Sequence, residues 1–159
     1  MAAKVLLIID VQDGFTKTKE AKKAVDYISS KLIPKKWDKV IQSRWENHMG
    51  SRYETDLGYC DVGDTKGTGM LVNTPGDHVI TRTCYSCFCP KLEALISKED
   101  EIYVCGLETD ACVLATLFDL WDNGYKFFVY SGGVATNAKD LQKPTLHLIA
   151  RQFGKGVLI

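Results

Sequence analysis

The sequence predicts an α/β fold, with a three-layer α/β/α, Rossmann-like arrangement around a mostly parallel sheet of about six strands. Two observations predict it. Short apolar or β-branched runs alternate along the chain with segments in which apolar residues recur at helical spacing. The run at 5–9 is apolar throughout and ends at Asp10, as expected of a strand buried on both faces. The 159 residues suffice for a single domain, over 1–159, with a substantial core.

In the amino-terminal half, the strand at 5–9 is followed by a helix at 19–32, whose apolar residues share one face and which Pro34 ends. A second strand is expected at 39–43. Residues 44–76 are rich in Gly, Asp and Thr and show no clear period, which predicts a long loop. Long loops in compact domains are often functional.

The carboxy-terminal half continues the alternation of strands and helices. Apolar, aromatic and β-branched content predicts strands at 78–81, 101–105, 125–130 and 156–159. Helices are expected at 90–96, 110–122 and 139–152. The first of these helices begins with a proline, the second is closed by Asn-Gly, and the third has an apolar face.

Charge and hydropathy exclude several kinds of partner. Lys+Arg and Asp+Glu are both 20, so the chain has no global positive charge that would favour nucleic acid. A solvated helix face explains the Lys-rich stretch 17–39 more simply than a binding patch. No apolar run is long enough to span a bilayer, and the run at 5–9 is too short for a secretory signal. We therefore expect a cytoplasmic protein that binds a small molecule and neither membrane nor nucleic acid.

The six cysteines are expected to be reduced in such a protein. Cys84, Cys87 and Cys89 lie close together and suggest zinc, but no second Cys or His pair stands at ligand spacing. Cys105 lies in a strand pattern, which is typical of a small core residue. The sequence therefore predicts neither a metal nor a cofactor.

The segment 104–116 predicts a buried strand, a tight turn and the start of a helix that contains Cys112. Thr109 or Asp110 suits the N-cap position of that helix. The positive end of a helix favours thiolate over thiol, and thiols at such positions often have pKa values of roughly 3.5–7.5. This segment offers a nucleophile and an oxyanion hole, and we expect Cys112 to be the thiol that alkylates first at neutral pH.

Asp10 and Arg82 each follow directly on a predicted strand, as does the turn before Cys112. Because ligands of parallel sheets bind at the carboxyl ends of strands, these residues can face one crevice. Asp10 is then a candidate base, although it can equally cap a turn or pair with a lysine. Arg82 can pair with Asp10 and stabilise a thiolate, or be an ordinary surface residue. His48 and His78 are further candidate bases outside any motif.

Three segments resemble the isochorismatase-like cysteine hydrolases. Asp10-Val-Gln-Asp-Gly-Phe15 resembles the Asp-x-Gln-x-x-Phe opening of that family. Arg82-Thr-Cys-Tyr-Ser-Cys-Phe88 is similar to the family's Lys-x-x-Tyr/Phe-Ser-x-Phe segment. Gly106-Leu-Glu-Thr-Asp-Ala-Cys112-Val-Leu-Ala-Thr116 is similar to its Gly-x-x-Thr-Asp-x-Cys-Val-x-x-Thr elbow. The motifs extend over nearly the whole chain in the family's order and spacing, and the elbow is the most specific of them.

The resemblance implies a catalytic triad of Asp10, Arg82 and Cys112, the isochorismatase-like fold, and a homo-oligomer, either a dimer or a tetramer. In nicotinamidase-type members the cysteine attacks a carbonyl carbon, an amine leaves, and water hydrolyses the thioester. The resemblance also implies a cis peptide before Glu108, with the N–H groups of Glu108 and Cys112 as the oxyanion hole. By position, the plausible walls of the substrate pocket are Phe15, Trp45, Asn47 and Tyr85.

The chain departs from the family pattern at several places. Position 82 is Arg where the family normally has Lys, and Arg keeps the charge but does not transfer a proton. The stretch 43–52 lacks the Asp-x-His of metal-binding nicotinamidases, so the chain resembles the metal-free branch. Glu108 is an unusual acidic neighbour of an oxyanion hole. Either its side chain points away or the site favours a cationic substrate.

These observations favour a cysteine hydrolase that acts on a small amide, a ureide or a related C–N substrate through a Cys112 thioester. A vinyl-ether substrate is disfavoured, because that chemistry does not need the cysteine. The alternative is a catalytically impaired family member that acts as a small-molecule binding or regulatory protein. A thiol sensor or redox enzyme is a third hypothesis, and the lack of a resolving cysteine beside Cys112 argues against it.

Overall fold

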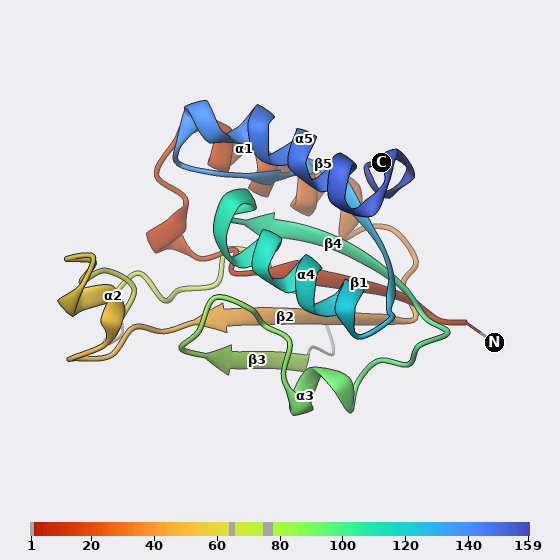
Figure 1. The fold of residues 1–159 in the computed structure, drawn as a ribbon, viewed down its shortest axis with the longest axis horizontal. Helices are drawn as coiled ribbons and strands as arrows, with labels where there is room; N and C mark the ends of the chain where they lie inside the picture. Colours follow the sequence, from red (N-terminus) through yellow and green to blue (C-terminus); the bar gives the residue numbers. More distant parts are fainter. Residues whose placement is uncertain (1, 64–65, 75–77) are drawn as a thin grey trace.

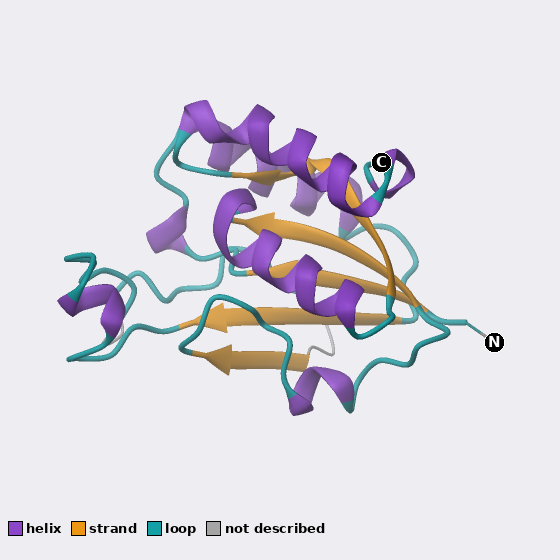
Figure 2. Ribbon diagram, in the orientation of Figure 1, coloured by secondary structure: helices purple, strands orange, loops and turns teal. Residues whose placement is uncertain are grey.

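A computed structural model describes residues 2–63, 66–74 and 78–159, and it confirms the predicted α/β fold with a parallel sheet (Figures 1 and 2). In these residues the sheet has five strands, all parallel, in the order β3-β2-β1-β4-β5. The strands are β1 (Lys4–Ile9), β2 (Lys39–Trp45), β3 (His78–Arg82), β4 (Glu101–Leu107) and β5 (Lys126–Ala135).

Helices cover both faces of the sheet, which gives three layers (Figure 1). The helices are α1 (Lys19–Tyr27), α2 (Arg52–Thr55), α3 (Pro90–Glu93), α4 (Leu114–Asp122) and α5 (Gln142–Phe153). Short 3-10 or π turns lie at Asp13–Phe15, Ile28–Leu32, Thr109–Val113, Lys139–Leu141 and Lys155–Val157.

Strand β1 is the centre of the core, because consecutive side chains of a strand point to opposite faces. Leu7 and Ile9 pack in one cluster with residues of α3, α4 and α5, and Leu6 and Ile8 pack in a second cluster with the residues that follow α1. All four side chains are fully buried. The continuous apolar run therefore forms a doubly covered strand, as predicted.

The predicted sixth strand at 156–159 is wrong. Lys155–Val157 forms a 3-10 turn instead, and Leu158 makes a single parallel bridge to Val129 of β5. The Ile159 N–H donates to the Val129 carbonyl at 3.0 Å, and its carbonyl accepts from the Ser131 N–H at 2.9 Å. Only the last two residues of the chain thus reach the edge of β5, which is too few for a strand.

The remaining elements are confirmed with shifted ends. Strands β2, β4 and β5 run beyond the predicted boundaries, and α3 is shorter than the predicted helix. The register of β5 shifts against β4, because Val104 pairs with Val129 and Gly106 pairs with Val134. Helix α2 lies inside the predicted loop, where the Ser51 side chain caps it by accepting from the Glu54 N–H.

Among the described residues, no helix combines the length and the apolar character needed to cross a membrane.

Candidate active site

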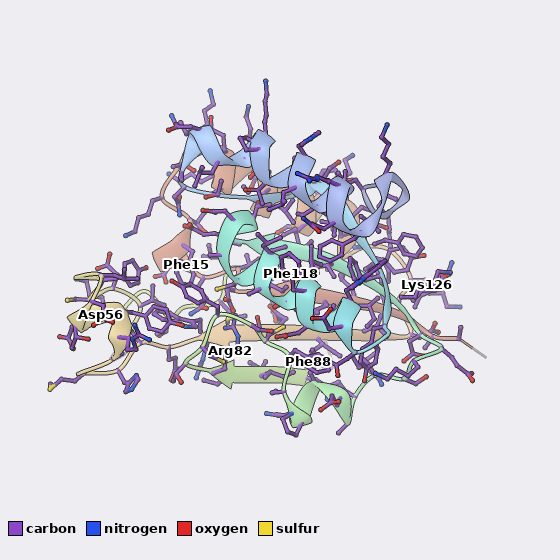
Figure 3. All side chains as sticks on the ribbon, in the orientation of Figure 1. Phe15, Asp56, Arg82, Phe88, Phe118 and Lys126 are labelled. Carbon is purple, nitrogen blue, oxygen red and sulfur yellow. The ribbon has the colours of Figure 1, made fainter. Side chains whose placement is uncertain are left out.

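The carboxyl ends of β1, β3 and β4 bring Asp10, Arg82 and Cys112 together. Asp10 follows β1, Arg82 is the last residue of β3, and Cys112 lies in the turn Thr109–Val113 after β4. Figure 3 shows Arg82 and Phe15 at this end of the sheet, and Lys126 at the opposite end. The three residues thus meet at the edge where the rule for parallel sheets predicts a ligand site.

Arg82 and Asp10 form a buried, bidentate ion pair. The Arg82 Nη1 donates to Asp10 Oδ1 at 2.9 Å, and Nη2 donates to Oδ2 at 2.7 Å. The Asp10 side chain is 0% exposed and that of Arg82 is 6% exposed. Arg82 is therefore not a surface residue, and its fork fixes the plane of the carboxylate.

Two further contacts hold this pair in place. The Ser43 hydroxyl, near the end of β2, donates to Asp10 Oδ1 at 2.7 Å, and the Arg82 Nη2 also donates to the Tyr85 carbonyl at 2.7 Å. Asp10 has a φ of 48°, which lies in the left-handed region that Asp tolerates better than most residues. Burial lowers the pKa of Arg82, but the Asp10 carboxylate together with Cys112 and Cys87 raises it by more, so Arg82 stays charged.

The carboxylate of Asp10 is nearly saturated with donors. Its Oδ1 accepts from Ser43 and from Arg82, and its Oδ2 accepts from Arg82. Each carboxylate oxygen has two acceptor positions. One position on Oδ2 is therefore left for a further donor, and Asp10 is near enough to Cys112 to raise the pKa of its thiol.

Cys112 is buried, with 6% of its surface exposed, and this reverses one expectation from the sequence. Burial raises the pKa of the Cys112 thiol well above its usual value, the Asp10 charge raises it further, and Arg82 acts in the opposite direction. The predicted acidification by the helix start does not dominate, because a buried thiolate loses its hydration. At neutral pH the resting group is a thiol.

The turn that carries Cys112 is built differently from the prediction. Its N-cap is Glu108, with no side-chain cap hydrogen bond, and neither Thr109 nor Asp110 takes that position. The Thr109 hydroxyl instead bonds to Gln142 Oε1 at 2.9 Å, which ties the turn to α5. The Leu107–Glu108 peptide is cis, as the family resemblance implies.

Thr116 connects this turn to the segment that follows Arg82. Its hydroxyl donates to the Cys112 carbonyl at 2.8 Å and accepts from the Cys87 N–H at 3.1 Å. Nothing in the sequence apart from the family motif indicated this role. Thr116 therefore links the Cys112 turn to the segment around Cys87.

A cavity of about 270 Å³ opens onto Cys112. Five aromatic side chains line it, together with Leu57, Glu108, Ala111 and Cys112; the five are Phe15, Trp45, Tyr53, Tyr59 and Tyr85. Trp45 is the hub of this aromatic group, since its ring centroid lies 5.8 Å from Phe15, 5.0 Å from Tyr53 and 6.0 Å from Tyr59. Tyr53 in turn lies 5.0 Å from Tyr85.

Three of the four predicted wall residues, Phe15, Trp45 and Tyr85, thus lie around Cys112, and Asn47 does not. The Asn47 Nδ2 donates to the Tyr59 carbonyl at 2.8 Å, and its Oδ1 accepts from the Ser51 hydroxyl at 2.6 Å. It lines a separate hollow with His48. The Asn47 amide therefore stabilises the loop that contains Ser51 and Tyr59.

Tyr53 and Tyr59 were not predicted as wall residues, although the aperiodic segment 44–76 holds Trp45, Tyr53 and Tyr59. That concentration of aromatic residues was the available signal. Burial, followed by the charges of Asp61, Glu108 and Cys112, raises the pKa of Tyr59 to about 12. Tyr59 therefore stays neutral in the physiological range.

The Glu108 side chain lines the cavity and is partly buried. Asn137, which follows β5, donates from Nδ2 to Glu108 Oε1 and to the Phe15 carbonyl. Burial raises the pKa of Glu108, and the hydrogen bond from Asn137 opposes that effect. Asn137 therefore positions both an acidic group and an aromatic wall, and no sequence pattern pointed to it.

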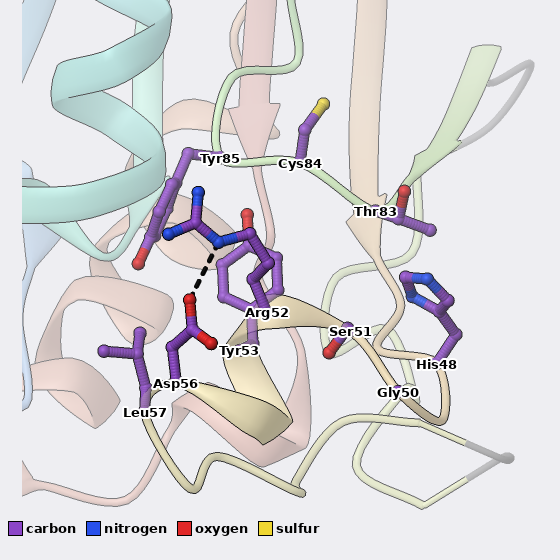
Figure 4. Close-up of a pocket in the computed structure, with 10 residues that line it drawn as sticks. All are labelled: His48, Gly50, Ser51, Arg52, Tyr53, Asp56, Leu57, Thr83, Cys84 and Tyr85. Atoms are coloured by element: carbon purple, nitrogen blue, oxygen red, sulfur yellow. Dashed lines mark hydrogen bonds and ion pairs between the residues drawn. The ribbon is translucent and has the colours of Figure 1, made fainter.

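A larger and more open hollow of about 660 Å³ adjoins this cavity (Figure 4). It shares Tyr53, Leu57 and Tyr85 with the inner cavity and contains the Arg52–Asp56 ion pair, at 2.8 Å. Cys112 does not line it. We regard it as the outer part of the same site.

In the residues that the structure describes, no group of three His, Cys, Asp or Glu side chains lies together as a metal site would require. His48 is exposed, and His78 is the exposed first residue of β3, at the opposite end of the sheet from Cys112. All six cysteines are free, Cys105 is buried in the core as predicted, and Cys84 is exposed while Cys87 is buried. The side chains present do not fit a metal, and we derive no step through one.

The fold and this cluster define an α/β protein with a buried cysteine, carboxylate and cation at the carboxyl edge of a parallel sheet. The Isochorismatase domain family matches residues 4–157. The chain belongs to the isochorismatase-like hydrolase family, as its motifs predict.

Two relatives share part of the sequence. Isochorismatase domain-containing protein 2 of Xenopus laevis is 31% identical over 80 residues, which cover 46% of this chain and 39% of the relative. The secreted isochorismatase effector Isc1 of Phytophthora sojae is 31% identical over 88 residues, which cover 53% of this chain and 41% of the relative. The matched segments span about two fifths of each relative.

Solved structures with the same fold include several amidases. Pyrazinamidase of Pyrococcus horikoshii, solved in complex with zinc, has a TM-score of 0.82 at 18% identity and covers 98% of this chain and 97% of its own. Nicotinamidase from Bacillus subtilis has a TM-score of 0.79 at 20% identity, over 100% and 99%. N-carbamoylsarcosine amidase from Thermoplasma acidophilum has a TM-score of 0.74 at 21% identity, over 97% and 94%. These similarities show the shared fold.

Proposed function

We propose that this protein is a cysteine hydrolase that cleaves a C–N bond in a small amide or ureide through a thioester on Cys112. One observation carries the proposal: the buried Cys112 thiol lines the aromatic cavity and lies near the buried carboxylate of Asp10, which keeps one acceptor position. Structural similarity to amidases supports it.

The reaction begins with a neutral thiol, since burial raises the pKa of Cys112. Asp10 accepts the thiol proton while the sulfur attacks the carbonyl carbon. The N–H groups of Glu108 and Cys112 stabilise the oxyanion. The N–H groups of Ala111 and Val113 do not take part, because both donate to the Glu108 carbonyl at 3.1 Å.

Asp10 next gives its proton to the departing nitrogen, and the C–N bond breaks to leave a thioester. A water molecule then loses its proton to Asp10 and attacks the thioester, the C–S bond breaks, and the sulfur recovers its proton. Arg82 moves no proton in either half. Its fixed charge orients Asp10 and stabilises the negative charge that passes between Asp10 and Cys112.

The second candidate function is small-molecule binding without turnover. The observation that favours it is the Arg82 fork, which occupies one position on each Asp10 oxygen while Ser43 takes a third. These donors leave fewer acceptor positions for the thiol proton.

A panel of small amides and ureides separates the two functions through release of ammonia or amine. We expect turnover by the wild-type protein and a loss of at least about 10³-fold in Cys112→Ala and in Asp10→Asn. Cys60→Ala, at an exposed cysteine outside the inner cavity, is the matched control and should keep the wild-type rate. Ligand binding without turnover by the wild type would favour the second candidate.

A further inference from the structure

The five rings around Cys112 form a cage of the kind that recognises cations. The rings are contiguous, with neighbouring centroids between 5.0 and 6.0 Å apart. Trp45, whose face attracts cations most strongly among side chains, is the hub and is only 3% exposed. A desolvated ring attracts a cation more strongly than an exposed one.

A carboxylate completes the cage. Glu108 lines the same cavity, and among the described residues its donors come from Asn137 alone, so its carboxylate keeps acceptor capacity for a ligand. The Asn137 side chain also binds the Phe15 carbonyl, and its Oδ1 accepts from the Thr18 N–H at 3.2 Å. Asn137 therefore ties the Glu108 carboxylate to the backbone of Phe15.

The charges around the cavity leave Glu108 without a counterion among the described lining residues. The cations near it are already paired: Arg82 with Asp10 at 2.7 Å and Lys17 with Asp61 at 2.7 Å. Asp110 adds negative charge close to Glu108. A partly buried carboxylate without a counterion is unfavourable, and a cationic ligand reduces that cost.

We infer that the substrate is a compact organic cation, an ammonium or amidinium group joined by a short link to the amide or ureide carbonyl. The cage of Phe15, Trp45, Tyr53, Tyr59 and Tyr85 holds the cation together with Glu108, and Cys112 faces the carbonyl. This inference rests on the proposed hydrolase function. The cavity of about 270 Å³ has room for about nine water-sized groups, which suits a small substrate.

A neutral aromatic amide is the rival substrate, since rings also stack on rings. It would use the aromatic walls and leave Glu108 unpaired. The two classes therefore differ in whether the positive charge contributes to binding.

Two amides of the same shape test the inference. Trimethylammonioacetamide carries a quaternary nitrogen, and 3,3-dimethylbutanamide has carbon in its place. Binding is measured by calorimetry on Cys112→Ala, which cannot form the thioester. We expect the cation to bind at least tenfold more tightly than its neutral isostere. Equal binding, tighter binding of the neutral amide, or no binding of either would overturn the inference.

Glu108→Gln in the same background keeps an oxygen that can accept from Asn137 and removes the charge. We expect it to reduce the preference for the cation at least fivefold and to leave the neutral amide within twofold. Glu101→Gln, the same change in the first residue of β4, is the matched control and should leave the preference unchanged. An unchanged preference in Glu108→Gln would overturn the assignment of Glu108. If that variant does not fold, the comparison of the two amides still decides the inference.

Ammonia release by the wild-type protein separates this inference from the proposed function. Preferential binding of the cation without hydrolysis of either amide would contradict the hydrolase and leave cation recognition intact. Hydrolysis of both amides with equal kcat/KM would support the hydrolase and overturn cation recognition.

Discussion

Among single residues, Arg82 has the largest influence on the chemistry of Asp10. A guanidinium binds both carboxylate oxygens at once, whereas an ammonium is a point charge. The fork at 2.7 and 2.9 Å orients the Asp10 carboxylate, and it also occupies acceptor positions that a proton would need. Arg82 therefore fixes the orientation of the carboxylate and leaves it fewer positions at which to accept a proton.

Arg82→Lys tests this trade-off. The lysine keeps the positive charge and releases at least one acceptor position on Asp10, so we expect kcat to stay the same or to rise by up to about tenfold. Arg82→Ala should instead lower the free energy of unfolding by about 3–5 kcal/mol, because it leaves a buried carboxylate without its partner. Steady-state rates and urea unfolding measure the two effects. A large loss of kcat in Arg82→Lys would show that catalysis needs the fork itself.

The pH dependence of labelling tests the protonation state of Cys112. Because burial raises its pKa, the thiolate fraction is small at pH 7 and grows as the pH rises. We expect iodoacetamide at pH 7 to label the exposed Cys60 and Cys84 before Cys112, with the Cys112 rate still rising above pH 9. Peptide mass mapping over time measures these rates. Preferential labelling of Cys112 at pH 7 would restore the acidified thiol expected from its place in the sequence.

Among the elements, the strands were the most predictable part and the loops were the least. The apolar run of β1 ends at Asp10, and the run of β4 leads into the cysteine turn, so the sequence predicted that Asp10 and Cys112 lie at the same edge of the sheet. The sequence did not reveal the shift of register in β5 or the single bridge at Leu158, because both depend on pairing between distant segments. The aromatic cage was only partly predictable, since segment 44–76 has no period from which side-chain directions follow.

The packing of β1 against β4 depends on Gly106. A Cβ on that residue would lie 2.0 Å from the Ile9 carbonyl oxygen, and its φ of 127° is one that L side chains rarely adopt. We expect Gly106→Ala to lower the free energy of unfolding by more than about 4 kcal/mol in urea titrations. Gly156→Ala, where no atom lies within 4 Å of the added Cβ, is the control and should change stability little. Equal stability of the two variants would contradict the close approach of the strands.

For the whole molecule, a neutral chain forms a site with a local excess of negative charge. Lys+Arg and Asp+Glu are both 20, yet Glu108 lines the cavity without a paired cation among the described lining residues. The position of the Glu108 charge follows only from the structure, because the sequence alone allowed the Glu108 side chain to point away from the cavity. A homo-oligomer and a cytoplasmic location stay predictions.

The mass of Cys112 during turnover is the most direct test of the proposed mechanism. The wild-type protein is mixed with the amide that it hydrolyses fastest, quenched in acid within milliseconds, and mapped by mass spectrometry. We predict an adduct on the Cys112 peptide equal in mass to the amide minus ammonia or amine, which disappears when the substrate is exhausted. Turnover without that adduct, or turnover that survives Cys112→Ala, would contradict the thioester mechanism.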